Sequence, residues 1–444
     1  MTLRLRLSGI SLAYFMVLLD TTVLSVAEPN LAASLHTATG GLQWTTTGYT
    51  VPFAALLLSA GAVADRYGAH RVFRVGVAVF GLGSLLSAFA PDLAVLVLLR
   101  ALLGAAAAAI VPASLSLLAR LYPDPAERAR AIALWAAISG AAVASGPIAG
   151  GALVELGGWR AIFYVNGPLA VLVLMLTAGP AIGCPRGDRH VDWLTQVVAC
   201  ATLALLTDAL IAAGSGAWLQ AGLAAAAALA AAILFVRLEL RSAAPVLNRA
   251  LLAARPVRAS LLVGAAVNFA LTGELFVLPL LFEQARHLSS LRTGLALLPL
   301  TLPFVLLPRL TGRLVARIGS RTPILAGLAM QAAGGVVLAS CVWTGAGYAW
   351  FVLGLLLTGA GVPFVLPSVV TAIVNAAPAG AAGAAGGLLN SIRQVGATIG
   401  VAVMGAFVAD ATGSGTGAPL LLAGACCAAA ATVFAAATSP GRGN

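Results

Sequence analysis

Three ionisable side chains, Asp20, Arg100 and Glu274, lie inside long apolar runs, where a charge is costly. An isolated ionised carboxylate midway along a lipid-embedded helix costs several kcal/mol, so Asp20 is expected to face water or to bind a proton. Either state suits a proton carrier. Arg100 stays protonated, and its fixed charge would help a nearby carboxylate such as Asp20 to release its proton. A structural interpretation stays open for each residue. Asp20 would then form helix-packing hydrogen bonds with Thr21 or Thr22 as neighbours, and Arg100 would donate to backbone carbonyls.

The second half of the chain carries a comparable set of polar residues. Glu274 follows Asn268 by six residues, and we predict that Glu274 binds substrate or protons. It is preferred to Asp208, which lies in a central pair of apolar runs away from the expected cavity. Near the cytoplasmic end of a late apolar run lies a polar cluster made of Asn390, Arg393 and Gln394. This cluster predicts either the hydrogen bonds of a gate or the lining of a cavity.

A third pattern combines small residues with a proline, namely Gly140, Gly146, Pro147, Gly150 and Gly151. Glycines four residues apart, such as Gly146 and Gly150, lie on one helix face and permit close contact with another helix. Pro147 removes a backbone hydrogen bond and bends a helix. We expect a bent, smooth helix against which another part of the protein moves, although packing alone would use the same residues.

Composition indicates which elements hold these residues. Of the 444 residues, 61% are hydrophobic and 9% are charged, whereas about 25% of a soluble domain is charged. So few charges cannot cover a surface that faces water, so the chain is expected to lie in lipid. A spanning helix needs about 20 apolar residues. This length predicts fourteen spans, at 9–29, 44–64, 72–90, 93–118, 131–154, 161–179, 193–213, 217–236, 259–281, 293–311, 322–343, 348–373, 385–408 and 417–437.

The placement of basic residues predicts the orientation, because cytoplasmic loops are enriched in them. All 25 basic residues are Arg. With a cytoplasmic N-terminus, twenty of the 25 lie on the cytoplasmic side, Arg100 and Arg393 lie within spans, and only Arg160, Arg286 and Arg292 lie outside. Both termini are therefore predicted to be cytoplasmic, in a chain that crosses the inner (cytoplasmic) membrane many times. The same placement accounts for the net charge of +11 without a nucleic-acid partner.

Two short loops in different halves of the chain have similar sequences. One is GAVADRYGAHR, starting at Gly61, and the other is GRLVARIGSRT, starting at Gly312. Parallel repeats of this kind are typical of transporters whose substrate site lies between two halves. We therefore predict an N-terminal six-helix bundle over 1–179 and a C-terminal six-helix bundle over 259–444. Residues 180–258 are expected to hold two extra helices and a cytoplasmic linker.

Five segments together resemble the major facilitator superfamily, and within it the fourteen-span branch of drug:proton antiporters. They are GAVADRYGAHR, LDTTVLSVAEPN in the first predicted span, GAAVASGPIAGG in the fifth, GWRAIFYVNGP entering the sixth, and LLNSIRQVGATIG in the thirteenth. They are spread over most of the chain and are specific for the family but not for a substrate. The resemblance implies an all-α, multi-pass fold that exports small amphipathic compounds, such as drugs or antibiotics, in exchange for protons.

The resemblance also implies roles for two groups of residues. Asp65, Arg66 and Arg71 would form a conformational latch on the cytoplasmic side. There Asp65 would dock at the N-terminus of the thirteenth span, near Gly386, where the helix dipole favours an anion. Alternatively, Asp65 is a loop residue whose charge is exposed to water and which takes no part in a latch. The glycines and the proline of the fifth span correspond to the antiporter motif of the family.

Three features depart from the family pattern. Leu103 replaces the usual polar residue before Gly104, Glu28 stands where an apolar residue is usual, and the tenth span has no acidic residue. The last departure weakens a prediction of dicationic drugs as substrates. An alternative function is the dedicated export of one endogenous secondary metabolite, which would confer self-resistance.

An enzyme is not expected from this sequence. It has no Walker loop for ATP and no soluble domain of enzymic size outside the bundle. Its four histidines are scattered over loops and form no metal cluster. We therefore predict no cofactor and no metal. The expected partners are a small amphipathic substrate, protons and the lipid bilayer, and the expected functional unit is a monomer.

Overall fold

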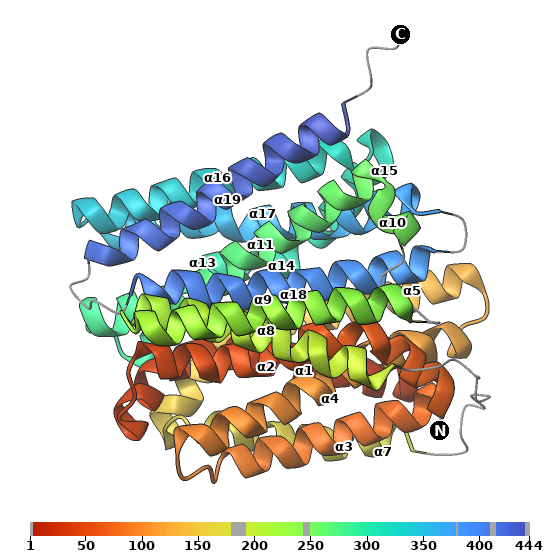
Figure 1. The fold of residues 1–444 in the computed structure, drawn as a ribbon, viewed down its shortest axis with the longest axis horizontal. Helices are drawn as coiled ribbons and strands as arrows, with labels where there is room; N and C mark the ends of the chain where they lie inside the picture. The colour runs from red at the N-terminus through yellow and green to blue at the C-terminus, as the bar shows by residue number, and fades with distance from the viewer. Residues whose placement is uncertain (1–2, 179–191, 243–248, 379–380, 409–413, 440–444) are drawn as a thin grey trace. The chain divides into compact units, whose positions relative to one another are not determined.

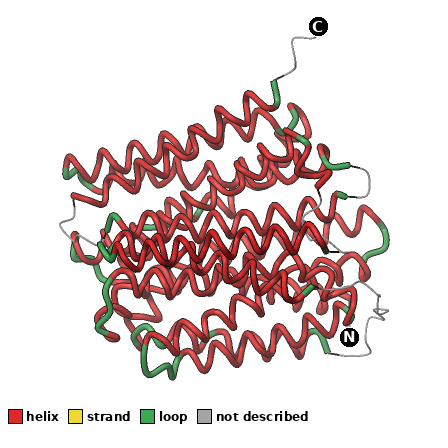
Figure 2. Tube along the Cα trace, viewed as in Figure 1, coloured by secondary structure: helices red, strands yellow, loops and turns green. Residues whose placement is uncertain are grey.

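The computed structural model describes residues 3–178, 192–242, 249–378, 381–408 and 414–439. Within these ranges all regular secondary structure is helical (Figure 2). The predicted cytoplasmic residues Arg186, Arg189 and Arg442 lie outside the described residues. The chain divides into two compact units, which are described separately. Unit 1 comprises Met1–Val246 with Phe282–Ala296, and unit 2 comprises Leu247–Leu281 with Leu297–Asn444.

Unit 1 contains the long helices of the first half of the chain and one short segment from the second half (Figure 1). Its helices are α1 (Leu3–Leu35), α2 (Thr39–Tyr67), α3 (Ala69–Ser87), α4 (Leu93–Leu121), α5 (Pro125–Gly157), α6 (Ala161–Tyr164), α7 (Asn166–Leu176), α8 (Trp193–Gly214), α9 (Trp218–Arg241) and α12 (Ser290–Ala296). A short π-helix, Leu281–Ala285, leads toward α12.

Unit 2 contains the remaining helices, several of which are short (Figure 1). They are α10 (Arg249–Ala253), α11 (Arg255–Leu280), α13 (Leu298–Thr301), α14 (Pro303–Leu306), α15 (Pro308–Ile318), α16 (Arg321–Thr344), α17 (Tyr348–Ala376), α18 (Ala382–Ala406) and α19 (Gly417–Ala437). A 3-10 turn at Ser414–Thr416 precedes α19.

Local signals in the sequence set several helix ends. The carboxylate of Asp92 accepts a hydrogen bond from the backbone N–H of Val95 at 2.9 Å and so begins α4. Asp124 does the same for Glu127 at 2.9 Å at the start of α5. Such side chains satisfy backbone donors that the first turn leaves unpaired. Gly68 separates α2 from α3 with φ of 91°, a conformation that glycine adopts without a steric cost.

Eleven described helices are long and apolar enough to cross a membrane, and a twelfth span results if the pair Leu298–Leu306 and Pro308–Ile318, bent by 55°, counts as one. An all-α, multi-pass membrane fold is therefore confirmed, while the predicted count of fourteen spans is not, since eleven or twelve of the described helices qualify as spans. The two other predicted spans are also helical. Ala161–Leu176 is apolar but shorter, and α18 carries the polar residues Asn390, Arg393 and Gln394 within its length.

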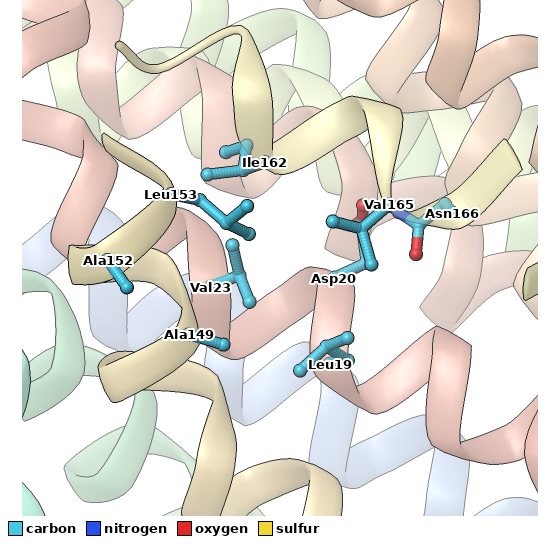
Figure 3. Close-up of a pocket in the computed structure, with 9 residues that line it drawn as sticks. All are labelled: Leu19, Asp20, Val23, Ala149, Ala152, Leu153, Ile162, Val165 and Asn166. Carbon is cyan, nitrogen blue, oxygen red and sulfur yellow. Dashed lines mark hydrogen bonds between the residues drawn. The ribbon is translucent and has the colours of Figure 1, made fainter. Parts of the chain in front are cut away.

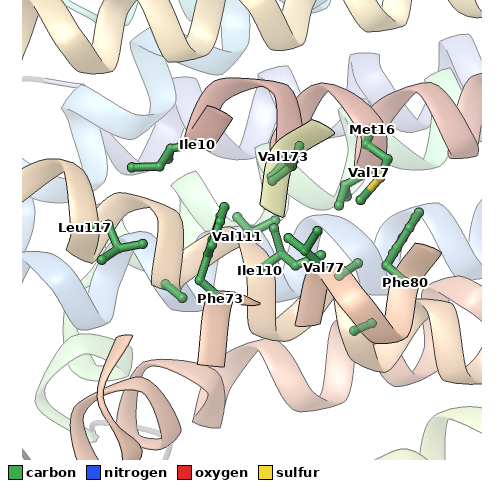
Figure 4. Packing of buried hydrophobic residues seen from close by; sticks show 14 of the residues in the cluster. Ile10, Met16, Val17, Phe73, Val77, Phe80, Ile110, Val111, Leu117 and Val173 are labelled. Atoms are coloured by element: carbon green, nitrogen blue, oxygen red, sulfur yellow. The ribbon is translucent and has the colours of Figure 1, made fainter. Parts of the chain in front are cut away.

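Buried apolar side chains from α1, α2, α3, α4, α5 and α7 fill the core of unit 1, and Figure 4 shows part of this cluster. The residues labelled there are Ile10, Met16 and Val17 of α1, Phe73, Val77 and Phe80 of α3, Ile110, Val111 and Leu117 of α4, and Val173 of α7. Small residues bring these helices close together: a Cβ added at Gly76 on α3 would lie 3.0 Å from Ile110 Cγ1. This packing fixes the relative positions of the helices that carry the polar residues of unit 1.

Candidate functional site

A buried ion pair joins α1 and α4 in unit 1. Arg100 Nη1 donates to Asp20 Oδ2, and both side chains are buried. Arg100 Nε donates to the backbone carbonyl of Thr45 on α2 at 3.0 Å, and Arg100 Cζ lies 4.6 Å from the centre of the Tyr49 ring. The structure therefore brings together the two charged residues that the sequence singled out in this half. Arg100 therefore forms the ion pair with Asp20 and, at the same time, the hydrogen bond to a backbone carbonyl that was the alternative interpretation of this residue.

The second oxygen of the Asp20 carboxylate has its own donor, which the sequence did not single out. Asn166 Nδ2 on α7 donates to Asp20 Oδ1 at 3.0 Å and lies 3.0 Å from Ser84 Oγ on α3. Ser84 Oγ donates to the carbonyl of Phe163 at 2.9 Å. Asp20 thus accepts one charged and one neutral hydrogen bond, and bonds to charged groups are the stronger kind. One feature of the sequence indicated a role for Asn166, because a polar amide inside an apolar run is unusual.

The neighbouring threonines do not account for the position of Asp20. Thr21 Oγ1 donates to the carbonyl of Leu18 at 2.8 Å. Thr22 Oγ1 donates to the carbonyls of Leu18 and Leu19 at 3.0 and 3.2 Å. Both hydroxyls therefore bond within their own helix, which is a common arrangement for threonine inside a helix. The contacts that hold the Asp20 carboxylate come instead from α4 and α7.

Glycine explains how Arg100 reaches its partners. Gly104 lies one turn after Arg100 on α4, and a Cβ added there would collide with the backbone carbonyl of Tyr49 on α2. A Cβ added at Gly48 on α2 would lie 3.1 Å from Val97 Cγ1 on α4. The two helices therefore touch almost backbone to backbone, as small residues permit in membrane bundles. This close approach places the Arg100 guanidinium between α2 and α1.

A cavity of about 290 Å³ lies beside the carboxylate, between α1, α5 and the segment that includes α6 and the start of α7. Figure 3 shows Asp20 and Asn166 on the side opposite Ala152 and Leu153. The other residues that line it are also apolar: Leu19, Val23, Ala149, Ile162 and Val165. Pockets that are mostly apolar with few polar groups are typical of small-molecule sites, although this one is at the small end of the range.

The glycines of the predicted antiporter motif hold α5 against two other helices. A Cβ at Gly146 would collide with Thr22 on α1, and one at Gly150 would lie 2.7 Å from the carbonyl of Val23. On another side, a Cβ at Gly151 would collide with the carbonyl of Ser290 in α12. Pro147 lies inside α5, which is continuous from Pro125 to Gly157, and Gly140 belongs to the same helix. The motif therefore forms close backbone contacts to α1 and α12.

The residues of the predicted latch lie around one turn between two helices. Asp65 and Arg66 are in the last turn of α2 and are exposed. Arg71 is exposed in the first turn of α3, where its backbone N–H donates to the carbonyl of Gly68 at 3.0 Å. Arg66 Cζ lies 5.6 Å from the centre of the Tyr67 ring. The helix N-terminus at which Asp65 was predicted to dock is that of α18, which belongs to unit 2.

Glu274, on α11 in unit 2, has a different environment from Asp20. Its residue is 1% exposed, and its Oε2 has no hydrogen-bond partner among the described residues. Asp208, which the sequence ranked lower, accepts hydrogen bonds from Gln220 Nε2 at 3.1 and 3.3 Å, between α8 and α9 of unit 1. Glu274 is therefore buried with one oxygen that accepts no hydrogen bond from the described residues, whereas both oxygens of Asp208 accept one.

The polar cluster of α18 forms hydrogen bonds to α11. Arg393 Nε donates to Asn268 Oδ1 at 3.2 Å, and Arg393 Nη1 donates to Asn390 Oδ1 at 3.0 Å. A Cβ at Gly264 on α11 would lie 3.1 Å from Arg393 Cγ, so the arginine stem packs against the glycine. Gln394 lies in the next position, and its carbonyl accepts from Thr398 Oγ1 at 2.9 Å. The structure thus joins Asn390 and Arg393 to Asn268.

Comparisons with known proteins give consistent results. The sequence profile of the Major Facilitator Superfamily matches residues 10–401. The multidrug resistance protein Stp of Mycobacterium tuberculosis is 35% identical over 408 residues, which cover 91% of this chain and 76% of the relative. The tetracenomycin C resistance and export protein of Streptomyces glaucescens is 33% identical over 415 residues, covering 92% and 76%. The crystal structure of a POT family transporter in complex with a thioalcohol-conjugated peptide has a similar fold, with a TM-score of 0.73, 11% identity, and coverage of 97% of this chain and 95% of that one.

Proposed function

This chain belongs to the major facilitator superfamily and is a membrane transporter rather than an enzyme, and we propose that it exports small amphipathic compounds across the cytoplasmic membrane in exchange for protons. The observation that carries the proton part is the buried pair of Asp20 and Arg100. A carboxylate inside a membrane is functional by default, because its burial is costly. Here a fixed cation stabilises the ionised form, so Asp20 is able to give up a proton inside the bundle.

In the proposed exchange, the charge of Asp20 determines how strongly it binds Arg100. When Asp20 is ionised, Arg100 balances its charge, and Asn166 and Arg100 hold both carboxylate oxygens. When a proton binds Asp20, that charge disappears and the contact between α1 and α4 weakens. We propose that proton binding and substrate binding alternate, so that each favours the opposite opening of the protein. Glu274 is proposed as a second residue that binds a proton or a polar group of the substrate.

The names of two relatives support the substrate class. One relative is a multidrug resistance protein, and the other is a resistance and export protein for tetracenomycin C. We infer that drugs or antibiotics with apolar surfaces are the substrates of this chain as well. The second name also favours the alternative, a dedicated exporter of one endogenous secondary metabolite that confers self-resistance. Growth-inhibition assays with a panel of antibiotics in a pump-deficient host separate the two: many protected compounds favour the broad exporter, and one favours the dedicated exporter.

We propose that the chain crosses the membrane fourteen times, with both termini in the cytoplasm. The candidate spans, together with Ala161–Leu176 and α18, supply fourteen helical segments at the predicted places. In this arrangement 1–179 and 259–444 are the two six-helix bundles, 180–258 holds the two extra helices and the linker, and a monomer is the functional unit. A reporter fused after Asn444 should behave as cytoplasmic, and external behaviour would contradict the proposed topology.

Three further roles belong to the same proposal. Asp65, with Arg66 and Arg71, closes the cytoplasmic side as a latch by docking at the N-terminus of α18. The antiporter motif of α5 provides a surface on which helices slide, supported by its close contacts to α1 and α12. The polar cluster of α18, consisting of Asn390, Arg393 and Gln394, lines the cavity or forms part of its gate, supported by the hydrogen bonds of Arg393 to Asn268 and Asn390.

Transport in energised membrane vesicles tests the proposed energy source. Export should stop when a protonophore removes the proton gradient, because the gradient drives the exchange. It should continue when ATP is depleted while the gradient is clamped. Transport that follows the ATP concentration under a clamped gradient would contradict proton exchange.

A further inference from the structure

A second carboxyl group of α1, that of Glu28, is buried in unit 1 and has no role in the mechanism proposed above. Its residue is 1% exposed. Oε1 accepts a hydrogen bond from Thr46 Oγ1 on α2 at 2.7 Å. Oε2 is buried and has no hydrogen-bond partner among the described residues. A buried carboxyl that is only half satisfied is costly, and an apolar residue would avoid that cost.

Glu28 is connected to the ion pair through α2. Thr46, which donates to Glu28, follows Thr45, whose backbone carbonyl accepts from Arg100 Nε at 3.0 Å. Glu28 and Arg100 are therefore held by adjacent residues of the same turn of α2. Arg100 is thus linked to two acids of the same helix. It contacts Asp20 directly, and it is linked to Glu28 across one residue step of α2.

Charged groups on the other elements packed against α1 are exposed or have partners of their own. Arg160, which precedes α6, donates from Nη2 to the carbonyl of Ala90 at 3.2 Å and lies over the Trp159 ring. Glu155 near the end of α5 is exposed and accepts a hydrogen bond from the backbone N–H of Leu291 at 3.1 Å. Arg292 of α12 is exposed. From α7, Asn166 is directed to Asp20. The groups that decide the charge of this region are therefore Asp20, Glu28 and Arg100.

The charges of these three groups favour one proton shared between two carboxyls. Arg100 always carries one positive charge, and one ionised carboxylate balances it. Two ionised carboxylates would leave a net negative charge in a buried region, and two protonated ones would leave the arginine unbalanced; both are costly. Glu28 and Asp20 do not touch each other, so the coupling between them runs through the charge of Arg100, which one ionised carboxylate at a time balances.

We propose that Glu28 is a proton relay residue, which holds the transported proton while Asp20 pairs with Arg100. The proton then leaves Glu28 and binds Asp20: an O–H bond of Glu28 breaks, an O–H bond of Asp20 forms, and the net charge of the three groups stays the same. The two residues are about 12 Å apart along the helix, so the proton passes through water or hydroxyl groups such as that of Thr46. The relay rests on the proposed proton exchange, in which Glu28 lies on the outer side of Asp20.

The relay predicts a specific change in pH dependence. In Glu28→Gln, protonation of Asp20 leaves Arg100 without a compensating carboxylate, so it requires a more acidic medium. Uphill export in proteoliposomes should therefore shift toward acidic external pH by about one unit, with about tenfold less export at a fixed neutral pH. Exchange of labelled for unlabelled substrate without a gradient should persist in this variant, which shows that the protein is folded. Glu28→Asp should recover export in part, because it keeps an acid.

Glu127→Gln is the matched control, since Glu127 is an exposed acid at the start of α5. It should keep the wild-type pH profile. If Glu28→Gln had the same profile as this control, the relay would be wrong, although wild-type export that a protonophore abolishes would still support proton exchange. If wild-type export itself were insensitive to the protonophore, the proposed function would fail, and the relay with it.

Discussion

Asp20 in unit 1 and Glu274 in unit 2 are both acids in the middle of apolar helices, and both are buried. Their partners differ. Both oxygens of Asp20 accept hydrogen bonds, one of them from a guanidinium, whereas Oε2 of Glu274 has no partner in the described structure. Breaking a buried charge pair by removing one partner is strongly destabilising, while a neutral carboxyl has no such dependence. The comparison shows that two buried acids differ in the partners of their oxygens, and we expect the proposed proton exchange to depend on this difference.

The largest expected effect on stability is that of Arg100→Ala. This change leaves Asp20 buried without its cation, so the free energy of unfolding should fall by about 3–5 kcal/mol. Thermal unfolding of the purified protein in detergent measures the change. Arg130→Ala is the control, since Arg130 is exposed on α5, and it should have little effect. If the two variants were equally stable, Asp20 would not be ionised beside Arg100, and the contrast with Glu274 would disappear.

Asn166→Ala should have the next largest effect. It removes the donor to Asp20 Oδ1 and leaves Ser84 without this neighbour. A hydrogen bond to a charged group contributes about 1.5–3 kcal/mol, and the loss of stability should lie in that range. Gln220→Ala removes a comparable amide donor to Asp208 at an exposed site, so it should cost clearly less in the same unfolding assay. Equal costs would mean that the Asp20 site has no special electrostatic character.

Glu274→Gln should affect stability less than either change. Glutamine keeps the shape of the side chain and resembles the protonated acid, so the free energy of unfolding should change by about 1 kcal/mol or less. Uphill export should fall while exchange without a gradient persists, if Glu274 takes part in proton binding. A destabilisation as large as that of Arg100→Ala would show that Glu274 is ionised and paired, which contradicts the comparison.

Asp65→Asn should leave stability unchanged, because Asp65 is exposed at the end of α2. Its effect should appear in kinetics: the rate of export should fall about two- to fivefold, which corresponds to the interaction of one charge with a helix terminus. Initial rates of export at matched expression measure this. Unchanged kinetics would remove the latch from the mechanism.

The sequence predicted most of the helical architecture, because each span is a local property of about 20 neighbouring residues. It was less successful where several short helices replace one span. The predicted span 293–311 corresponds to the short helices α12 to α15, which Pro299, Pro303 and Pro308 interrupt because proline removes backbone donors. Hydropathy averages over such breaks and does not reveal them.

The candidate site was predicted in part. Asp20 and Arg100 were identified because a charge in an apolar run is conspicuous, but their contact joins residues 80 positions apart. Asn166 is 146 positions from Asp20, and an uncharged amide gives only a weak signal. Glu28 was noticed as a departure from the family, but its bond to Thr46 depends on how α1 faces α2. Contacts of this kind depend on helix packing, which a single sequence does not specify.

Uphill export by two variants of Asp20 is the most direct test of the central claim. Asp20→Asn keeps size and hydrogen-bonding capacity but cannot carry a proton, whereas Asp20→Glu keeps the acid and adds one methylene. If Asp20 exchanges the proton, export against a gradient should be lost in Asp20→Asn, by about 100-fold or more, and partly retained in Asp20→Glu. A purely structural role predicts the opposite order, with the asparagine mild and the glutamate worse. At matched expression, export by Asp20→Asn at the wild-type rate would contradict the account and move proton exchange to another acid.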